Sequence, residues 1–295
     1  MIDLYGVDLD GLFDEIGIKL TGPGRNVSSG WSGTSCPFCG DTSNHLGIHN
    51  ERKIYTCWSC GSKGSLPKLL KELLRCEWNS VFTLLEKHNT GKPISRVEKP
   101  DIKTVSLPEK GKLTDLAKKY LEQRKLDYEF LVDKYSIFDG GISGFFKFRI
   151  VLPVYMDKIL VSATSRDYTG KSEIRYKGLP SDKSVHPLRE CVYGLDHIGD
   201  RAILVEGPFD VFRLYPFGVA MMGLRLNPMQ MYSLFKKNLS YLLICLDRGT
   251  ERKAEKIALN LSSFIPKVEI ALLETGKDPG ECFFSEIMDM KKRMI

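Results

Sequence analysis

Four acidic side chains in the C-terminal third of the chain stand at or just beyond the ends of apolar runs: Glu206, Asp210, Asp247 and Asp278. Carboxylate oxygens gathered on a rigid rim are the ligands that Mg²⁺ or Mn²⁺ prefers, especially where phosphates complete the coordination. If the fold brings these four side chains together, the sequence predicts a divalent-metal site that handles a polyphosphate.

Four cysteines form a second reactive set, as two Cys-x-x-Cys pairs: Cys36 with Cys39, and Cys57 with Cys60. Two residues between the thiolates let one tight turn offer both sulfurs, and two such turns complete a tetrahedron around Zn²⁺. A glycine, Gly40 or Gly61, follows each pair and permits the left-handed backbone that closes the turn. A redox pair would need only one such motif. His45 and His49 are alternative ligands, but they lie in the segment between the pairs.

The elements that must position these residues follow from hydrophobic patterns. The segment between the cysteine pairs alternates and contains β-formers, so it predicts a hairpin and hence a zinc ribbon. Apolar runs predict strands over 202–206, 218–223, 241–247 and 267–274, with helical stretches between and after them. Continuous apolar strands separated by helices predict a buried parallel sheet with right-handed crossovers.

A parallel sheet places its ligand site beyond the carboxyl ends of its strands. Glu206, Asp247 and Asp278 would then converge on one edge, with Asp210 one turn into the first helix. Helix capping is the alternative interpretation for Asp247 alone, but capping does not require all three acids to meet at the same edge.

Composition predicts a globular protein of two or three domains, with 295 residues, 42% hydrophobic and 27% charged. The net charge of +6 leans toward an anionic partner, and residues 143–190 alone hold nine Lys/Arg against five Asp/Glu. No apolar run is long enough to span a membrane, and the N-terminus lacks the pattern of a signal peptide. We therefore expect a cytoplasmic protein with reduced or metal-bound cysteines. The other four cysteines are expected in cores: Cys76, Cys191, Cys245 and Cys282.

The expected fold class is α/β and multidomain. The zinc ribbon, with helices over 66–88, occupies 1–90, and a linker rich in proline and charge occupies 91–112. A basic mixed α+β subdomain follows over 113–198, and the parallel α/β sheet covers 199–295.

Several stretches carry a resemblance to a known family. LVEGPFD, ICLDRGTERKA and ETGKDPGE together resemble the TOPRIM domain shared by DnaG-type primases, topoisomerases and certain nucleases. FRIVLPVY and KILVSATSRDYTG resemble the basic subdomain that precedes TOPRIM in DnaG-type primases, and the ribbon resembles their N-terminal zinc-binding domain. Cys39 stands where that family often has a histidine. The resemblance covers nearly the whole chain in the right order. The compact length is similar to that of bacteriophage primases, and a phage-encoded protein would act in the host bacterial cytoplasm.

The resemblance implies metal-dependent synthesis of short RNA primers on single-stranded DNA from ribonucleoside triphosphates, with a replicative helicase as partner. It makes all four acids catalytic, with Glu206 the candidate general base and with Glu206, Asp247 and Asp278 as ligands of Mg²⁺ or Mn²⁺. Basic side chains would hold template or nucleotide phosphates: Lys147, Arg149, Arg166 and Lys177. The ribbon would read the template through aromatic and polar side chains: Trp31, Phe38, Tyr55, Trp58, His45 and Arg52. Phe38 or Tyr55 fits the ribbon's small core equally well.

The pattern departs from the family at two acids. Gly249 stands where TOPRIM enzymes usually carry a second aspartate, and Gly280 where primases often place another acid. Glu251 and Glu281 are the nearby acids that would replace them, and we expect one tight and one weak metal site. Two alternative functions stay open. One is a zinc-ribbon, single-stranded-DNA-binding helicase loader with a degenerate TOPRIM domain, and the other is a TOPRIM nuclease.

Overall fold

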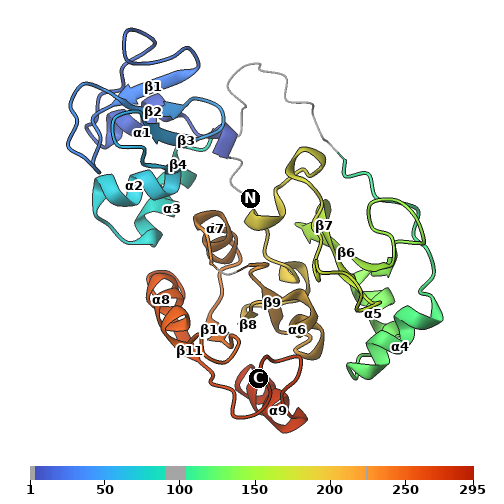
Figure 1. Ribbon diagram of the computed structural model, residues 1–295. Coiled ribbons are helices and arrows are strands. Elements are labelled where there is room, and N and C mark those ends of the chain that lie inside the picture. The colour runs from blue at the N-terminus through green and yellow to red at the C-terminus, as the bar shows by residue number, and fades with distance from the viewer. Residues whose placement is uncertain (1–3, 91–103, 224) are drawn as a thin grey trace. The chain divides into compact units, whose positions relative to one another are not determined.

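The computed structural model describes residues 4–90, 104–223 and 225–295 (Figure 1). The chain divides into two compact units, Met1–Glu98 (unit 1) and Lys99–Ile295 (unit 2). None of the helices in the described part of the chain combines the length and apolar composition needed to cross a lipid bilayer.

Unit 1 is built on a four-stranded antiparallel sheet in the order β1-β2-β3-β4. Its strands are β1 (Trp31–Thr34), β2 (Leu46–His49), β3 (Ile54–Cys57) and β4 (Lys63–Ser65). Its helices are η1 (Leu4–Gly6), α1 (Leu9–Glu15), α2 (Leu66–Leu74) and α3 (Trp78–Lys87). The predicted hairpin is β2–β3, and the predicted helices over 66–88 are α2 and α3. Leu66, Leu69 and Leu70 lie on one buried face of α2, as helical spacing requires.

Unit 2 begins with an antiparallel three-stranded sheet in the order β5-β6-β7. Its elements are α4 (Asp115–Gln123), α5 (Tyr128–Tyr135), β5 (Phe138–Asp139), β6 (Arg149–Met156) and β7 (Ile159–Asp167). The short helices η2 (Ser181–Lys183), η3 (Leu188–Glu190) and η4 (Leu195–His197) follow. Most of the expected linker, 91–103, lies outside the described residues. Val105, although placed in that linker, is buried in the core of this sheet beside Phe138 and Val151, and Leu107 packs against the same core.

The C-terminal part of unit 2 is a parallel sheet in the order β11-β10-β8-β9. Its strands are β8 (Arg201–Val205), β9 (Gly218–Ala220), β10 (Tyr241–Ile244) and β11 (Lys267–Ile270). The helices are α6 (Pro208–Arg213), α7 (Pro228–Lys236), α8 (Glu251–Leu261) and α9 (Phe284–Arg293). The alternation of strands and helices is therefore as predicted. All four residues of β10 and the last four of β8 are buried, which explains why these strands are continuous apolar runs.

Candidate functional site

The four cysteines of unit 1 form two matching turns. Gly40 N–H donates to Cys36 O and Gly61 N–H donates to Cys57 O, each at 2.9 Å. Both glycines have the left-handed backbone that the sequence predicts, with φ of 72° and 73°. The turns therefore present their sulfurs in the same way.

The sulfur atoms have the spacing of a zinc site. Cys36 Sγ lies 3.9 Å from Cys60 Sγ, Cys39 Sγ lies 4.0 Å from Cys57 Sγ, and all four lie within 4.8 Å of one another. Tetrahedral Zn–S bonds of about 2.3 Å place sulfurs roughly 3.8 Å apart. Burial raises the pKa of the Cys36 thiol, which opposes its ionisation without a cation. The donor set and spacing fit Zn²⁺.

Neither histidine belongs to the cysteine cluster. His45 Nδ1 lies 2.9 Å from Asp41 Oδ1, and the His45 N–H donates to the same carboxylate. His49 Nδ1 accepts from the backbone N–H groups of Glu51 and Arg52. Both rings are thus occupied within the ribbon.

The candidate aromatic residues of the ribbon separate into core and surface. Tyr55 is 1% exposed and belongs to the core, and the half-buried Phe38 stacks on it with ring centroids 5.4 Å apart. Trp58 is 45% exposed and meets Trp31 edge-on at 5.5 Å. The Trp58 ring packs directly over Gly47, where a Cβ would lie 2.4 Å from a ring carbon. Trp31 and Trp58 therefore remain the candidates for stacking on bases.

Asp210 is the most enclosed of the four acids in unit 2, with 8% of its surface exposed. Its Oδ2 accepts from Gly207 N–H at 3.2 Å and its Oδ1 accepts from Gly280 N–H at 3.0 Å. Burial, followed by the charges of Asp278 and Asp247, raises the pKa of Asp210 to about 7. Asp210 thus links the start of α6 to the loop that carries Asp278.

Backbone contacts tie the acid-bearing loops together. Arg213 on α6 donates from one guanidinium nitrogen to Pro279 O and Cys282 O, both at 2.9 Å. Arg248 N–H donates to Lys277 O at 2.9 Å, which joins the loop after β10 to the loop after β11. These bonds join α6, which follows β8, and the loop after β10 to the loop after β11.

The remaining acids present oxygens without hydrogen bonds. Asp247 Oδ1, Asp278 Oδ1 and Glu206 Oε1 are buried and have no hydrogen-bond partner among the described residues. Burial, with the charges of Glu206 and Asp278, raises the pKa of Asp247 to about 6. Burial, with Glu281, also raises the pKa of Asp278. Buried carboxylate oxygens without hydrogen bonds, such as those of Asp247 and Asp278, are groups that a cation would stabilise.

The acids are neighbours without being a closed ligand shell. Within the described ranges, the cysteine set alone brings three or more ligand atoms within 4.8 Å of one another. The four carboxylates nevertheless interact electrostatically. The charges of Asp278 and Asp247 raise the pKa of Asp210, and the charge of Glu206 raises the pKa of Asp247. The edge is acidic, and its carboxylates lie close enough to raise one another's pKa.

The structure distinguishes the two missing acids. A Cβ at Gly280 would lie 2.7 Å from Asp210 Oδ1 and 3.0 Å from Asp278 Oδ1, so a side chain at this position would have to displace these carboxylates. A Cβ at Gly249 would meet no heavy atom within 4 Å in the described part of the chain, although φ there is 85°. The absence of an acid at position 280 therefore has a steric reason, while the absence at 249 leaves open space.

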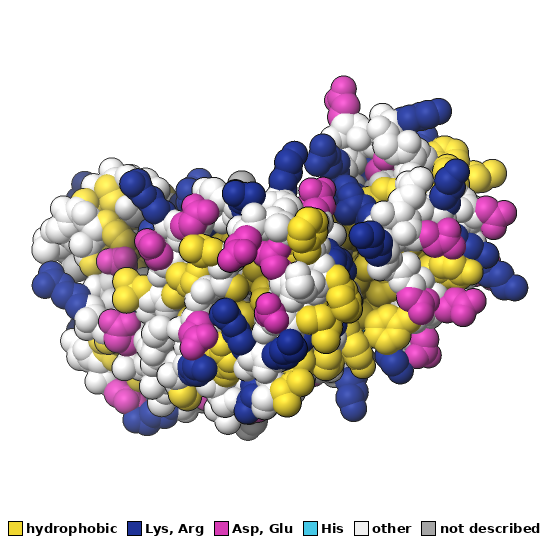
Figure 2. All heavy atoms as spheres, turned by 90° about the horizontal axis from the view of Figure 1, so that it is seen from below, with side chains coloured by type: hydrophobic (Ala, Val, Ile, Leu, Met, Phe, Trp, Pro, Cys, Tyr) yellow, Lys and Arg dark blue, Asp and Glu magenta, His cyan; other side chains and the backbone are white. Residues whose placement is uncertain are grey.

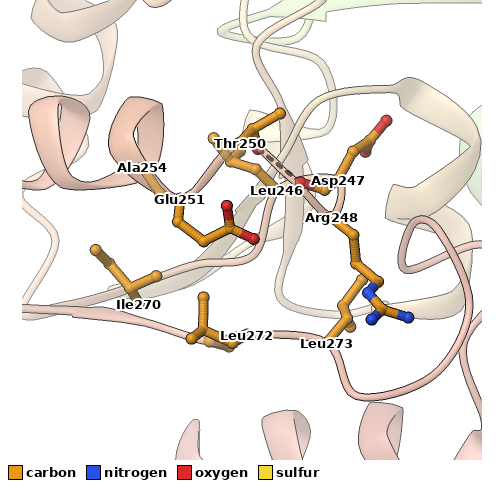
Figure 3. A pocket seen from close by; sticks show the side chains of 10 residues that line it. Leu246, Asp247, Arg248, Thr250, Glu251, Ala254, Ile270, Leu272 and Leu273 are labelled. Atoms are coloured by element: carbon orange, nitrogen blue, oxygen red, sulfur yellow. Dashed lines mark hydrogen bonds between the residues drawn. The ribbon is translucent and has the colours of Figure 1, made fainter.

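Glu251 and Glu281 are not equivalent replacements. The Glu251 carboxylate accepts from Gly249 N–H at 3.0 Å. In Figure 3 it points into a pocket between Ala254, Ile270 and Leu272, whereas Asp247 points the opposite way. That pocket has a volume of about 10 Å³, enough for roughly one water molecule. Glu281, in contrast, raises the pKa of both Asp278 and Asp247, so its charge lies near the acidic edge.

The four predicted basic residues have different environments. Arg149 is 6% exposed, and its guanidinium donates to Ser172 Oγ at 2.8 Å, Ile174 O at 2.7 Å and Arg175 O at 3.3 Å. We expected Arg149 to hold a phosphate, but a side chain with these partners holds the 172–175 loop instead.

The other three are more accessible. Lys147 is exposed, Lys177 Nζ lies 3.8 Å from the centroid of the Phe145 ring, and Arg166 Nε donates to Tyr120 Oη at 2.8 Å. Lysines and arginines alternate with acidic side chains on the face seen in Figure 2, so that face carries no uniform basic field.

Two cationic side chains that no sequence pattern indicated lie near the acids. Arg124, at the end of α4, lies over the rings of Tyr120 and Phe209 at 5.1 and 5.7 Å, and its charge lowers the pKa of Asp278. Lys253 Nζ lies 2.9 Å from Glu206 Oε1 without hydrogen-bond geometry. Arg124 had no spacing signal, and Lys253 could have been suspected only from its place in the first turn after Asp247.

Known proteins are similar both to the zinc ribbon and to the chain as a whole. Residues 8–99 match the CHC2 zinc finger family. The match includes both cysteine pairs, so unit 1 contains a zinc-binding site. A DNA primase from Thermotoga maritima is 23% identical over 319 residues, covering 88% of this chain and 55% of the relative. The chain thus spans about half the length of this curated relative.

Two solved structures are similar to the chain. The Aquifex aeolicus primase structure, with zinc binding and RNA polymerase domains, has a TM-score of 0.49 at 20% identity, covering 99% of this chain and 83% of that chain. The primase fragment of the bacteriophage T7 primase-helicase protein has a TM-score of 0.43 at 14% identity, covering 88% and 96%.

Proposed function

We propose that this chain, with its CHC2 zinc finger and its likeness to a DNA primase, synthesises short RNA primers on single-stranded DNA. The observation that carries the proposal is the acidic edge of the parallel sheet, where Asp247 and Asp278 present buried oxygens without hydrogen bonds. Its substrates are then ribonucleoside triphosphates and a DNA template, and a replicative helicase is the expected partner that supplies single strands.

Glu206, Asp247 and Asp278 would hold Mg²⁺ or Mn²⁺, and Asp210 positions the Asp278 loop behind them through its bond to Gly280. When bound, the metal would activate a primer 3′-hydroxyl and neutralise charge on the triphosphate. Glu206 directly follows β8. With one oxygen against Lys253 and the other on the metal, it would have none left to accept the hydroxyl proton, so we assign it the role of a ligand rather than that of the general base.

Two arginines near the acid-bearing segment fit the anionic substrates. Arg124 acts electrostatically on Asp278, and Arg166 lies over the Tyr176 ring at 4.7 Å from its centroid. Guanidinium groups held against aromatic rings keep their donors oriented for phosphate oxygens. We assign phosphate binding to Arg124, Arg166, Lys147 and Lys177, and a structural role to Arg149.

The zinc ribbon would select the template. Trp31 and Trp58 on its surface offer faces on which unpaired bases can stack. Such stacking tolerates many sequences, so discrimination would come from polar neighbours such as Arg52.

The test is incorporation of labelled ribonucleotides on a mixed pool of single-stranded DNA templates, with Mg²⁺ and then with Mn²⁺. The full chain is compared with Asp247→Ala, Cys57→Ser and the exposed-site control Asp182→Asn. We expect short, template-dependent RNA from the wild type and the control, and none from the other two. Degradation of the DNA would instead indicate a nuclease, and binding without synthesis would indicate a helicase loader.

A further inference from the structure

Lys253 brings a positive charge into the acidic edge. It lies in the first turn of α8, and its Nζ approaches Glu206 Oε1 to 2.9 Å. The two side chains are only 24% and 14% exposed, so solvent screens this pair weakly. No hydrogen-bond partner for Nζ occurs in the described parts of the chain, which leaves its charge directed at the carboxylates.

The ammonium also acts beyond Glu206. Its charge lowers the pKa of Asp247, opposing the effects of burial and of Glu206 and Asp278. It therefore lies close to the acids that end β8 and follow β10. A buried carboxylate without a nearby cation is costly, and one lysine offsets part of the repulsion between these two strands.

The same edge is short of ligand oxygens around Asp247. Gly249 carries no side chain, Glu251 turns into the pocket on the other side, and a side chain at Gly280 would have to displace neighbouring carboxylates. Asp210 already uses both of its oxygens for backbone N–H groups. Lys253 Nζ lies against Glu206 Oε1, so a second divalent ion beside Glu206 would have to displace the ammonium.

We propose that the Lys253 ammonium is a resident cation of this site, standing where a second divalent ion would otherwise bind beside Glu206. The chain then binds one Mg²⁺ or Mn²⁺, held by Asp247 and Asp278 with the second oxygen of Glu206. This inference rests on the metal site of the proposed function and specifies its charge balance.

The experiment counts Mn²⁺ ions bound to the full, zinc-loaded chain by the loss of the electron paramagnetic resonance signal of free Mn²⁺. Wild type should bind one ion. Lys253→Met should bind two, and its unit 2 should unfold at a lower urea concentration in Mn²⁺-free buffer, with recovery when Mn²⁺ is added. Lys256→Met removes an exposed lysine from the same helix and should match wild type in both measurements.

A second variant covers the case in which Lys253→Met does not fold. Glu206→Gln combined with Lys253→Met removes both charges of the pair, so it should regain stability without Mn²⁺ and bind one ion. Two equal ions in wild type, or a Lys253→Met protein with one ion and wild-type stability, would overturn the inference. So would a double variant as unstable as Lys253→Met. Ion counting needs no primer synthesis, so an inactive protein with the expected counts would refute only the proposed function.

Discussion

Replacing Asp210 by asparagine should remove much of the pH dependence of stability in unit 2 when Mg²⁺ is absent. Burial and the neighbouring acids raise the pKa of Asp210 to about 7, against about 3.9 in an unfolded chain. Between these values the folded protein holds a proton that the unfolded chain releases. The stability of the metal-free protein therefore falls as pH rises from about 4 to about 7, by up to about 4 kcal/mol from this group.

The substitution has a cost that does not depend on pH. Both oxygens of Asp210 accept backbone N–H groups, from Gly207 and Gly280, whereas asparagine offers one oxygen. Losing one of these bonds costs about 1–3 kcal/mol. Asp210→Asn should thus be close to or below wild type near pH 5. Its stability relative to wild type should rise by about 3 kcal/mol between about pH 5 and about pH 8.

The assay is urea unfolding of the zinc-loaded full chain in Mg²⁺-free buffer. All three tryptophans, Trp31, Trp58 and Trp78, lie in unit 1, so their fluorescence follows unit 1 alone. Far-ultraviolet circular dichroism follows both units, and the difference isolates unit 2. Asp182→Asn, at an exposed position of unit 2, should follow the wild-type pH dependence. Parallel pH dependences for wild type and Asp210→Asn would refute the reasoning.

Two further predictions concern the cysteines and glycines. Cys57→Ser should lose the bound zinc because a thiolate ligand is removed, whereas His49→Ala should keep one zinc per chain. Elemental analysis measures the zinc content of both variants. Zinc loss in His49→Ala would contradict the four-cysteine site. Gly280→Ala should weaken Mn²⁺ binding, because its Cβ would press on the carboxylates of Asp210 and Asp278. Gly249→Ala faces open space and should cost about 1–2 kcal/mol of stability with unchanged Mn²⁺ affinity, and equal affinities in the two variants would exclude the steric argument.

Much of the architecture could be predicted because local patterns specified it. The two Cys-x-x-Cys pairs with their glycines specify the zinc turns by themselves. The apolar runs ending at Glu206 and Asp247 indicate buried parallel strands, and topology then brings their ends to one edge. These predictions need only the chain's own periodicity and spacing.

The rest depends on neighbours that are distant in sequence. Arg149 looks like a phosphate ligand until the 172–175 loop is seen around its guanidinium. Gly280 looks like a lost ligand until Asp210, far away in sequence, is found against it. Only the folded arrangement shows that Glu251 and Glu281 face different surroundings. Contacts of this kind leave no periodic signal.

In the strand order β11-β10-β8-β9, strands that follow β8 in the sequence are added first on one side of it and then on the other. From β8 the chain moves to β9 on one side, and then crosses back past β8 to β10 on the other. The connections leaving β8 and β10 therefore diverge, and ligand sites of parallel sheets lie beyond the carboxyl ends of two such strands. Glu206 directly follows β8 and Asp247 lies shortly after β10. The place of the proposed site is thus a property of the winding of the chain, which substitutions in the helices would leave unchanged.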